Sequence, residues 1–473
     1  MSARRAKLVC TLGPASGTEG GVRALAEAGT DVFRVNLSHG DPATHAELVR
    51  LVRAAASELG RDLAVMADLP GPKIRLGELA EEPLRLDAGT AFALRADERP
   101  GDASGAPTTY PGLARDVRPG DRVLLADGAV ELVVRDIEGS DVVTEVIRAG
   151  SVRARAGVNV PAERLSLPAL TERDREGLAR ALDLGVDLIA QSFVRAPADP
   201  IGLRALMGDR PVPIVAKIET RPAVEAIDAV LLEADALMVA RGDLGVELPM
   251  EEIPILQKEL LRKARAAGKP AIVATQMLES MIHAPRPTRA EASDVANAVL
   301  DGADAIMLSG ETAIGDFPVE AARAAARIAE VAEERAGRFR TPREPCRHTD
   351  EAAAVAHAAA QVAAGDPEVV AIACYTGTGR TAALLSAERP GVPIFAFSSH
   401  PEVRRALGVR WGVTALAASS PVDTDEMIAA MDAGLRAAEM VTAGQAVVMA
   451  ASSPAGKAHT NMLKVHHIGS AVR

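Results

Sequence analysis

Eight short apolar segments recur along the 473-residue chain and alternate with stretches of helical periodicity. They have the length of buried strands and are bounded by turn-forming residues: Lys7–Gly13, Asp31–Leu37, Leu63–Leu69, Asp187–Phe193, Pro213–Glu219, Ala236–Gly242, Ala271–Met277 and Ala305–Gly310. Helices are predicted at Gly20–Ala28, Thr44–Leu59, Glu172–Leu184 and Glu251–Ala267. Eight apolar strands alternating with helices predict an α/β fold, a (β/α)₈ TIM barrel.

The pattern changes after the third predicted strand. Short strands separated by Gly, Asp and Pro replace the long helical periods; they are Leu84–Leu86, Ala91–Leu94, Arg122–Leu125, Glu131–Val134 and Val142–Val146. We therefore predict an all-β domain over 72–156, inserted into a barrel loop at the carboxyl end of the strands. Its position suggests a lid, and the alternative is an insertion without a role in catalysis.

A charged, Pro-containing linker, Glu333–Asp350, precedes a third region with its own strands and helices. The strands are predicted at Val369–Tyr375, Pro393–Phe397, Gln445–Ala450 and Lys464–Ile468. The predicted domains are thus a barrel (1–71 and 157–340), an inserted lid (72–156) and a C-terminal α/β domain (345–473).

Composition narrows the class of protein. Lys and Arg number 53 and Asp and Glu 64, a net charge of −11, which argues against binding nucleic acid by phosphate neutralisation. No apolar run reaches 18 residues, and no apolar segment follows the basic start of the chain, so neither a membrane span nor a signal peptide is expected. Cys10, Cys346 and Cys374 are too far apart for a disulfide framework or a zinc cluster. We expect a cytoplasmic protein.

Reactive side chains follow six of the eight predicted barrel strands. They are Arg34, Asn36, Ser38, Asp68, Lys217, Glu219, Arg241, Asp243, Thr275, Gln276, Ser309 and Glu311. The carboxyl ends of barrel strands meet at one face, where catalytic groups collect. Buried charges are costly unless they are paired or bound to a metal, so the pattern predicts an active site at this face.

Two of the carboxylates suggest a metal. Glu219 and Asp243 on neighbouring strands form the oxygen-rich pair that Mg²⁺ prefers, and the lack of a His/Cys cluster disfavours zinc. Lys217 lies two residues before Glu219, so an ammonium and a metal would together stabilise a developing oxyanion such as an enolate. The alternative is a buried Lys–Glu–Asp salt bridge. Arg34 and Arg75 are candidates for holding phosphate oxygens.

Several longer motifs also resemble the pyruvate kinase family. They are Lys7–Ser16 (KLVCTLGPAS), Asp31–Gly40 (DVFRVNLSHG), Gly71–Arg75 (GPKIR), Lys217–Glu219 (KIE), Met238–Glu247 (MVARGDLGVE), Ala274–Met281 (ATQMLESM), Pro287–Leu300 (PTRAEASDVANAVL) and Met307–Ala313 (MLSGETA). The resemblance is close in the barrel, moderate in the third domain and loose in the insertion. It implies transfer of the phosphoryl group of phosphoenolpyruvate to ADP, giving pyruvate and ATP.

The resemblance also implies roles for single residues. Lys217 stabilises the transferring phosphoryl group and the enolate oxygen, and Glu219 and Asp243 hold Mg²⁺. The backbone at Gly242 and Asp243, with Thr275, binds the substrate carboxylate, and Thr275 belongs to the relay that protonates the enolate carbon. Arg34 binds the substrate phosphate, while Asn36, His39 and Arg75 bind the nucleotide, which brings a second Mg²⁺.

The chain departs from the family pattern at two positions. Many members bind K⁺ through residues matching Asn36, Ser38, Asp68 and the carbonyl of Leu69, with a Glu where this chain has Lys73. An ammonium can supply the charge of the ion, and only eight of the 53 basic residues are Lys, so we expect activity without K⁺. Related chains also carry a Lys at the lid hinge where this chain has Ala156, with Arg153 and Arg155 nearby.

A Gly-rich turn in the third domain resembles the effector loop of the family. Residues Thr376, Gly377, Thr378, Gly379, Arg380 and Thr381 (TGTGRT) lie between a strand and a helix, where backbone N–H groups face an anion. The alternative is an ordinary strand–helix turn. The expected ligand is a phosphorylated effector (a sugar monophosphate, AMP or fructose bisphosphate), and the expected assembly is an allosterically regulated homotetramer.

Two other functions compete with this interpretation. A Mg²⁺-enolate aldolase or lyase on the same barrel would share the paired carboxylates but lack the lid and the GPKIR and SHG motifs. A non-catalytic, effector-binding relative would have lost Lys217, Glu219, Asp243 or Thr275, and all four are present.

Overall fold

The computed structural model describes residues 4–126, 128–335, 350–453 and 460–470. Eight parallel strands close into a barrel, which confirms the predicted fold class. In order around the barrel they are β1 (Lys7–Thr11), β16 (Ala305–Leu308), β15 (Ala271–Ala274), β14 (Ala236–Ala240), β13 (Ile214–Ile218), β12 (Leu188–Gln191), β3 (Ala64–Leu69) and β2 (Val32–Asn36).

Most of these strands end before their predicted ends because the backbone turns away at the mouth of the barrel. After β14 the chain enters a helix directly, and after β15 Thr275 and Gln276 adopt positive φ angles of +70° and +54°. Several site residues predicted to lie on strands therefore lie on the loops and helices that follow them.

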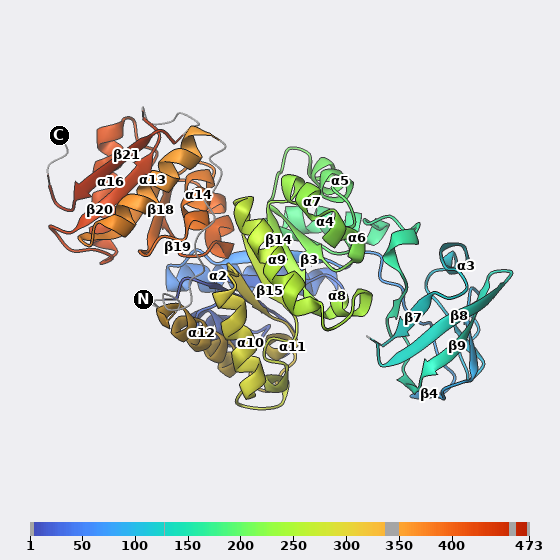
Figure 1. Cartoon of the computed structure of the whole chain (residues 1–473). Coiled ribbons are helices and arrows are strands. Elements are labelled where there is room, and N and C mark those ends of the chain that lie inside the picture. The colour runs from blue at the N-terminus through green and yellow to red at the C-terminus, as the bar shows by residue number, and fades with distance from the viewer. Residues whose placement is uncertain (1–3, 127, 336–349, 454–459, 471–473) are drawn as a thin grey trace.

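Helices surround the barrel as predicted (Figure 1). They are α1 (Glu19–Glu27), α2 (Pro42–Leu59), α4 (Glu172–Asp183), α5 (Ala198–Met207), α6 (Arg221–Glu225), α7 (Ile227–Glu233), α8 (Arg241–Glu247), α9 (Ile253–Ala266), α10 (Arg289–Leu300), α11 (Gly310–Ala313) and α12 (Pro318–Arg335), with 3₁₀ turns at Ala162–Arg164 and Glu279–Ile282. Side-chain caps set several starts: Asp41 caps α2, and Thr171 with Asp174 forms a capping box on α4. Apolar residues fill both the barrel interior and the layer between strands and helices.

The inserted segment folds into sheets with their own apolar core. A six-stranded sheet has the order β11 (Val158–Asn159), β7 (Arg122–Leu125), β8 (Val130–Glu138), β9 (Asp141–Arg148), β5 (Ala91–Arg95) and β6 (Gly105–Pro107), and β10 (Gly150–Val152) pairs with β4 (Leu84–Leu86). One short helix, α3 (Leu113–Asp116), lies between β6 and β7 in the chain. Strand β11 continues the sheet just beyond residue 156, where we predicted that the insertion ends.

The C-terminal region is an α/β domain with a five-stranded sheet. Its order is β19 (Val413–Ala417), β18 (Ile394–Ser398), β17 (Val369–Tyr375), β20 (Ala446–Ala451) and β21 (Met462–His467), and only β21 is antiparallel. Helices α13 (Glu351–Gly365), α14 (Arg380–Glu388), α15 (Pro401–Ala406) and α16 (Thr424–Ala437), with a 3₁₀ turn at Leu407–Val409, complete the domain. Four of the strands were predicted, and β19 was not, because Thr and Ala dilute its apolar run.

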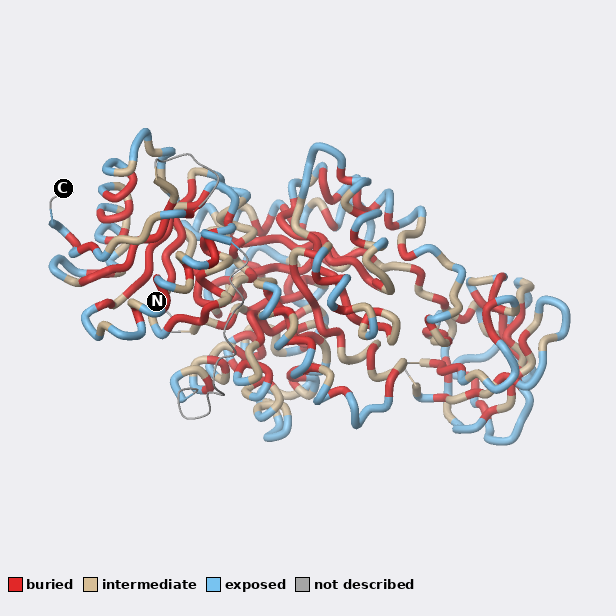
Figure 2. Tube along the Cα trace, turned by 45° about the horizontal axis from the view of Figure 1, so that its top comes forward, coloured by how far each residue is buried: buried red, intermediate tan, exposed pale blue. Residues whose placement is uncertain are grey.

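The insertion and the C-terminal domain lie at opposite ends of the barrel (Figure 1). The C-terminal domain meets the amino ends of the strands, where Lys7 Nζ donates to the carbonyl of Val413 at 2.7 Å and Arg405 pairs with Asp187 at 2.7 Å. Figure 2 shows that the strands of both the barrel and the adjoining C-terminal sheet are largely buried. The insertion therefore lies at the carboxyl ends of the barrel strands, as predicted for a lid.

Two further sequence predictions concern the linker after the barrel and membrane-spanning segments. Helix α12 extends into the predicted linker as far as Arg335, and most of the rest of that linker, with Cys346, lies outside the described residues. Among the described helices, none combines the length and apolarity that crossing a membrane requires.

Candidate active site

Four charged side chains meet at the carboxyl end of the barrel. Lys217 Nζ lies 3.2 Å from Asp68 Oδ1 and 2.9 Å from Glu219 Oε1. Arg34 Nε donates to the other oxygen of Asp68 at 2.7 Å. Arg34 and Lys217 are each 9% exposed, and Asp68 and Glu219 are no more than 2% exposed. The structure thus brings together four residues that the sequence places at the ends of three strands.

The network keeps Lys217 and Asp68 charged. Burial alone lowers the pKa of Lys217, but Asp68 and Glu219 more than offset it, and the pKa is raised overall. Burial raises the pKa of Asp68, and Lys217 and Arg34 outweigh that effect, so this pKa is lowered. At neutral pH an ammonium and a carboxylate therefore face each other inside the barrel mouth.

Glu219 and Asp243 supply the hard oxygen donors of the predicted metal site. Burial raises the pKa of Glu219; Lys217 opposes the shift and the nearby Asp243 carboxylate adds to it. One oxygen of Glu219 accepts from the backbone N–H of Phe193 at 2.9 Å. Two neighbouring carboxylates suit Mg²⁺, which takes one or two protein carboxylates and completes its shell with water and substrate. No group of three or more His, Cys, Asp and Glu that could hold a metal occurs in the described part of the chain.

Helix α8 and Thr275 form the adjoining wall. The N–H of Gly242 donates to the Thr275 hydroxyl at 2.8 Å, and that hydroxyl donates to the carbonyl of Ala274 at 2.6 Å. Arg241 holds the start of α8 against Thr275, because its guanidinium donates to Asp294 at 2.6 Å and to the carbonyl of Thr275 at 2.8 Å. The left-handed backbone of Thr275 costs free energy, of the order of 1–3 kcal/mol, and such strain is typical of functional sites.

The predicted nucleotide-binding residues lie at the outer rim. Asn36 accepts from the N–H of Ser38 at 3.1 Å, and His39 is exposed. Arg75, at the base of the insertion, donates to the carbonyl of Arg155 at 2.9 Å. Partial loss of solvent around the ring and the surrounding cations, Arg75 first among them, lower the pKa of His39. The rim therefore carries clustered positive charge, which attracts an anionic ligand.

The predicted monovalent-cation residues lie together at the ends of β2 and β3. Asn36 lies opposite Asp68 in the register of β2 and β3, with Leu69 next in the chain. The Asp68 carboxylate accepts from Arg34, Lys217 and Ser192. Lys73 Nζ lies 3.8 Å from Asp243 Oδ1, so its charge is directed at a carboxylate of the proposed metal site.

At the neck of the insertion, the Ala156 side chain packs against the apolar core of that domain. The carbonyl of Ala156 accepts from the N–H of Leu76 at 2.8 Å. The neighbouring Arg155 guanidinium pairs with Glu78 at 3.0 Å and is largely exposed.

The sequence did not lead us to predict two polar side chains of the site. Ser192 Oγ accepts from Lys217 Nζ at 2.6 Å, and Thr11 Oγ1 accepts from Arg34 at 3.1 Å. They lie at the ends of β12 and β1, the two strands to which no candidate was assigned. A hydroxyl at the end of an otherwise apolar strand was the signal that could have identified them.

The predicted effector loop forms a tight turn before α14. The Thr376 hydroxyl accepts from the N–H of Gly379 at 2.9 Å, and Gly379 has a φ of +84°. Gly377 and Thr378 are exposed, and Arg380 pairs with Asp350. Thr381 is buried and shares a hydrogen bond with Thr460.

The fold and this site define a (β/α)₈-barrel protein with a cluster of charged side chains at the carboxyl ends of the strands and a lid-like insertion beside it. Residues 3–322 match the family model described as pyruvate kinase, barrel domain, and residues 353–466 match that of pyruvate kinase, alpha/beta domain. The chain belongs to the pyruvate kinase family.

Relatives named pyruvate kinase are similar over nearly the whole length. Those from Mycobacterium intracellulare and Mycobacterium tuberculosis (strain ATCC 25618 / H37Rv) are each 44% identical over 472 residues, covering 98% of this chain and 99% of the relative. The relative from Corynebacterium glutamicum is 43% identical over 473 residues, with 99% of each chain covered.

Proposed function

We propose that this chain is a pyruvate kinase that transfers the phosphoryl group of phosphoenolpyruvate to ADP, giving pyruvate and ATP in the last step of glycolysis. The observation that carries the proposal is the Lys217 ammonium held between Asp68 and Glu219, with Asp243 beside Glu219. Phosphoryl transfer depends on positioning and charge neutralisation more than on a covalent partner, and this network supplies both.

Lys217 acts as an electrostatic group. Because its pKa is raised, it remains protonated at neutral pH and is a donor rather than a base. In the proposed reaction its ammonium donates to the transferring phosphoryl group and to the enolate oxygen. Arg34, anchored by Asp68 and Thr11, offers its guanidinium to the substrate phosphate.

Glu219 and Asp243 are the residues that would hold Mg²⁺. When bound, the ion supplies positive charge that neutralises oxygens of the substrate and the transferring group. A second Mg²⁺ would arrive with the nucleotide. Burial raises the pKa of Glu219, and repulsion from the Asp243 carboxylate adds to that shift.

The substrate carboxylate would lie against the start of α8. The backbone of Gly242 and Asp243 and the hydroxyl of Thr275 are the proposed donors. The existing bond from Gly242 to Thr275 holds these groups together before substrate binds. We also assign Thr275 to the relay that protonates the enolate carbon.

Asn36, His39 and Arg75 are the proposed nucleotide ligands. They border the cationic rim between the barrel and the insertion (72–156). We propose that the insertion is a lid that covers the bound nucleotide, since it lies at the carboxyl ends of the strands (Figure 1).

The enzyme is also proposed to work without K⁺. The Lys73 ammonium lies 3.8 Å from Asp243 and adds positive charge to the site, as a bound monovalent ion would. Asn36, Ser38, Asp68 and Leu69 are the ligands expected for that ion in K⁺-dependent members of the family.

Regulation would come from the C-terminal domain. Thr376–Thr381, at the start of α14, are proposed to bind a phosphorylated effector such as a sugar phosphate or AMP, supported by the positive-φ Gly379 and the adjacent helix N-terminus. We further propose an allosteric homotetramer that works in the cytoplasm.

The test is a paired product assay with phosphoenolpyruvate, ADP and Mg²⁺. Equal amounts of pyruvate and ATP, both lost when ADP is omitted or Mg²⁺ is chelated, are expected. Carbon–carbon bond cleavage of a candidate hydroxy-acid substrate, with no ATP formed, would favour the lyase alternative. No product, with candidate sugar phosphates and AMP also present, would favour a non-catalytic relative.

A further inference from the structure

A short loop between β2 and α2 presents Asn36, Ser38 and His39 at the rim of the site. The loop turns at Gly40, which has a φ of +79°, and α2 begins at Pro42 with Asp41 as its cap. Within the loop, the N–H of Ser38 donates to Asn36 Oδ1 at 3.1 Å and the N–H of His39 donates to the carbonyl of Asn36 at 3.3 Å. Because these local bonds are few, the conformation of the loop depends on contacts with neighbouring elements.

His45, in the first turn of α2, supplies one such restraint. Its Nε2 lies 2.7 Å from the carbonyl oxygen of His39. A carbonyl oxygen only accepts, so Nε2 carries the proton and donates. His45 is 8% exposed, whereas His39 is exposed, so a buried ring holds the backbone of an exposed residue.

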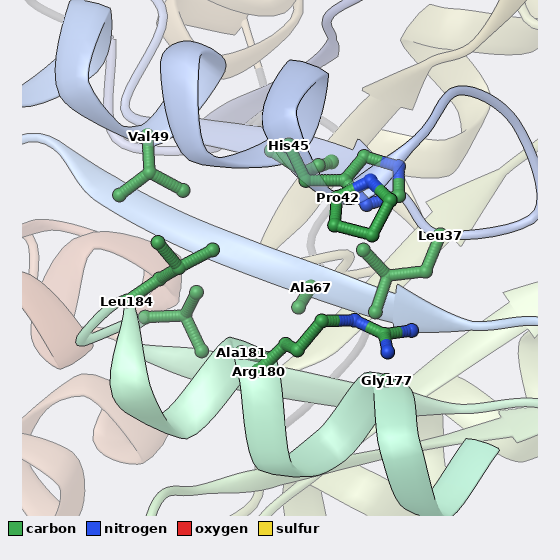
Figure 3. A pocket seen from close by; sticks show the side chains of 11 residues that line it. Leu37, Pro42, His45, Val49, Ala67, Gly177, Arg180, Ala181 and Leu184 are labelled. Atoms are coloured by element: carbon green, nitrogen blue, oxygen red, sulfur yellow. The ribbon is translucent and has the colours of Figure 1, made fainter. Parts of the chain in front are cut away.

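The surroundings of the ring favour this single orientation. Figure 3 shows His45 beside Pro42, facing the strand that carries Ala67, with α4 on the far side. A cavity of about 20 Å³ lies between these elements, and its lining is aliphatic apart from His45 and Arg180. The space is close to that of one water and is apolar, so it offers the ring little in place of the His39 carbonyl.

A second side chain holds the same loop from the other flank. Arg173 of α4 donates to the carbonyl of Ser38 at 3.2 Å and lies 3.4 Å from that of Leu37. The carbonyls of three successive residues, 37 to 39, are thus bound by the two helices that flank the loop. Their peptide planes set where Asn36, Ser38 and His39 present their side chains.

We propose that His45 is a positioning residue that holds the Leu37–Gly40 loop, through its bond to the His39 carbonyl, in the conformation that binds a nucleoside diphosphate. The inference rests on the proposed nucleotide role of Asn36, His39 and Arg75. His45 itself is buried behind the loop and acts only through the backbone.

The experiment compares His45→Leu, which removes the donor, with His45→Gln, which keeps an N–H donor at similar reach. For His45→Leu we expect the KM for ADP to rise about tenfold, as for loss of one well-formed buried hydrogen bond. The kcat and the KM for phosphoenolpyruvate should change less than about threefold, and His45→Gln should recover most of the ADP affinity. Val49→Ala, which enlarges the same cavity one turn along α2, is the matched control and should leave the KM for ADP unchanged.

Hydrogen exchange provides a readout independent of turnover. Exchange in a peptide covering residues 36–41 should accelerate in His45→Leu but not in Val49→Ala. The proposal is wrong if folded His45→Leu keeps the wild-type KM for ADP, or if all three variants change both KM values and kcat alike. A wild-type protein that forms no ATP would instead overturn the proposed function. Hydrogen exchange would then still test whether His45 restrains the loop.

Discussion

The two ends of the barrel both bury charged side chains, but they arrange them in opposite ways. At the amino end, Asp31, Asp187, Asp235 and Asp304 each stand directly before a strand. Each accepts a hydrogen bond from a backbone N–H of the neighbouring strand and pairs with an arginine. Every carboxylate there is surrounded by donors.

Asp187 illustrates the amino-end arrangement most fully. It accepts from the N–H of Val65 at 2.7 Å and pairs with Arg53 at 2.8 Å and with Arg405 of the C-terminal domain at 2.7 Å. Its hydrogen-bonding capacity is used within the protein, and it joins the barrel to the adjoining domain.

The carboxyl end places like charges side by side. The Asp243 carboxylate repels that of Glu219, and Lys217 is shared between Glu219 and Asp68, while Arg34 also pairs with Asp68. Such an arrangement is unfavourable until a ligand supplies the missing charge. Buried charge alone therefore does not mark the active site of this barrel; the two neighbouring carboxylates, Glu219 and Asp243, do.

Removing a charge at the carboxyl end should abolish chemistry. For Lys217→Met we expect kcat to fall by about 10³-fold or more, because an ammonium directed at the developing negative charge is lost. Steady-state rates together with circular dichroism check this. A folded variant that keeps more than a tenth of the activity would contradict the assignment.

Removing a charge at the amino end should cost stability instead. In Asp187→Asn, Arg53 and Arg405 lose their shared carboxylate, which should lower the free energy of unfolding by about 3 kcal/mol. Well below the unfolding temperature, kcat should stay within about twofold, since the site is at the other end of the barrel. Urea unfolding and rates measured on one preparation test the contrast, and a large loss of kcat with full stability would reverse it.

A change at the rim should expose the role of Lys73. Lys73→Glu replaces a positive charge beside Asp243 with a negative one. Activity without K⁺ should fall about tenfold, equal to about 1.4 kcal/mol of barrier, and added K⁺ should restore much of it. The check is a K⁺ titration of both proteins at constant ionic strength. Wild-type enzyme that itself requires K⁺ would disprove the argument.

The smallest expected effect concerns Glu247, at the end of α8. It lines a cavity of about 280 Å³ between the insertion and the barrel, and burial raises its pKa from 4.5 to about 7. The folded state then binds a proton that the unfolded chain loses above about pH 4.5, so this group makes stability fall as pH rises to about 7.

Glu247→Gln removes that titration. The variant should be more stable than wild type by about 1 kcal/mol at pH 8, a value reduced for partial exposure, and equal to it near pH 4.5. Urea unfolding of both proteins at the two pH values gives the answer. A difference independent of pH would show that the buried carboxyl does not titrate in this range.

The barrel and the core of its site were predictable because each depends on local sequence. Apolar strands with a reactive residue at the end, such as Lys217 and Glu219, carry their own signal. The positive φ of Thr275 and the entry of the chain into α8 straight after β14 are tertiary effects, so the predicted strands ran too far.

Contacts between distant segments were the least predictable. Ser192 and Thr11 are single hydroxyls whose partners lie 25 and 23 residues away. The ion pair between Lys73 and Asp243 links the base of the insertion to α8, whereas the sequence had suggested the monovalent-cation site as the environment of Lys73. Strand β19 was missed because alanine and threonine give little periodic contrast.

The most direct test is the initial rate of ATP formation from phosphoenolpyruvate, ADP and Mg²⁺ in a buffer free of K⁺ and NH₄⁺, measured for wild type and Lys217→Met side by side. We expect turnover by the wild type and a rate about 10³-fold lower in the variant. Wild-type silence that persists when K⁺ and a phosphorylated effector are added, or equal rates in the two proteins, would contradict it.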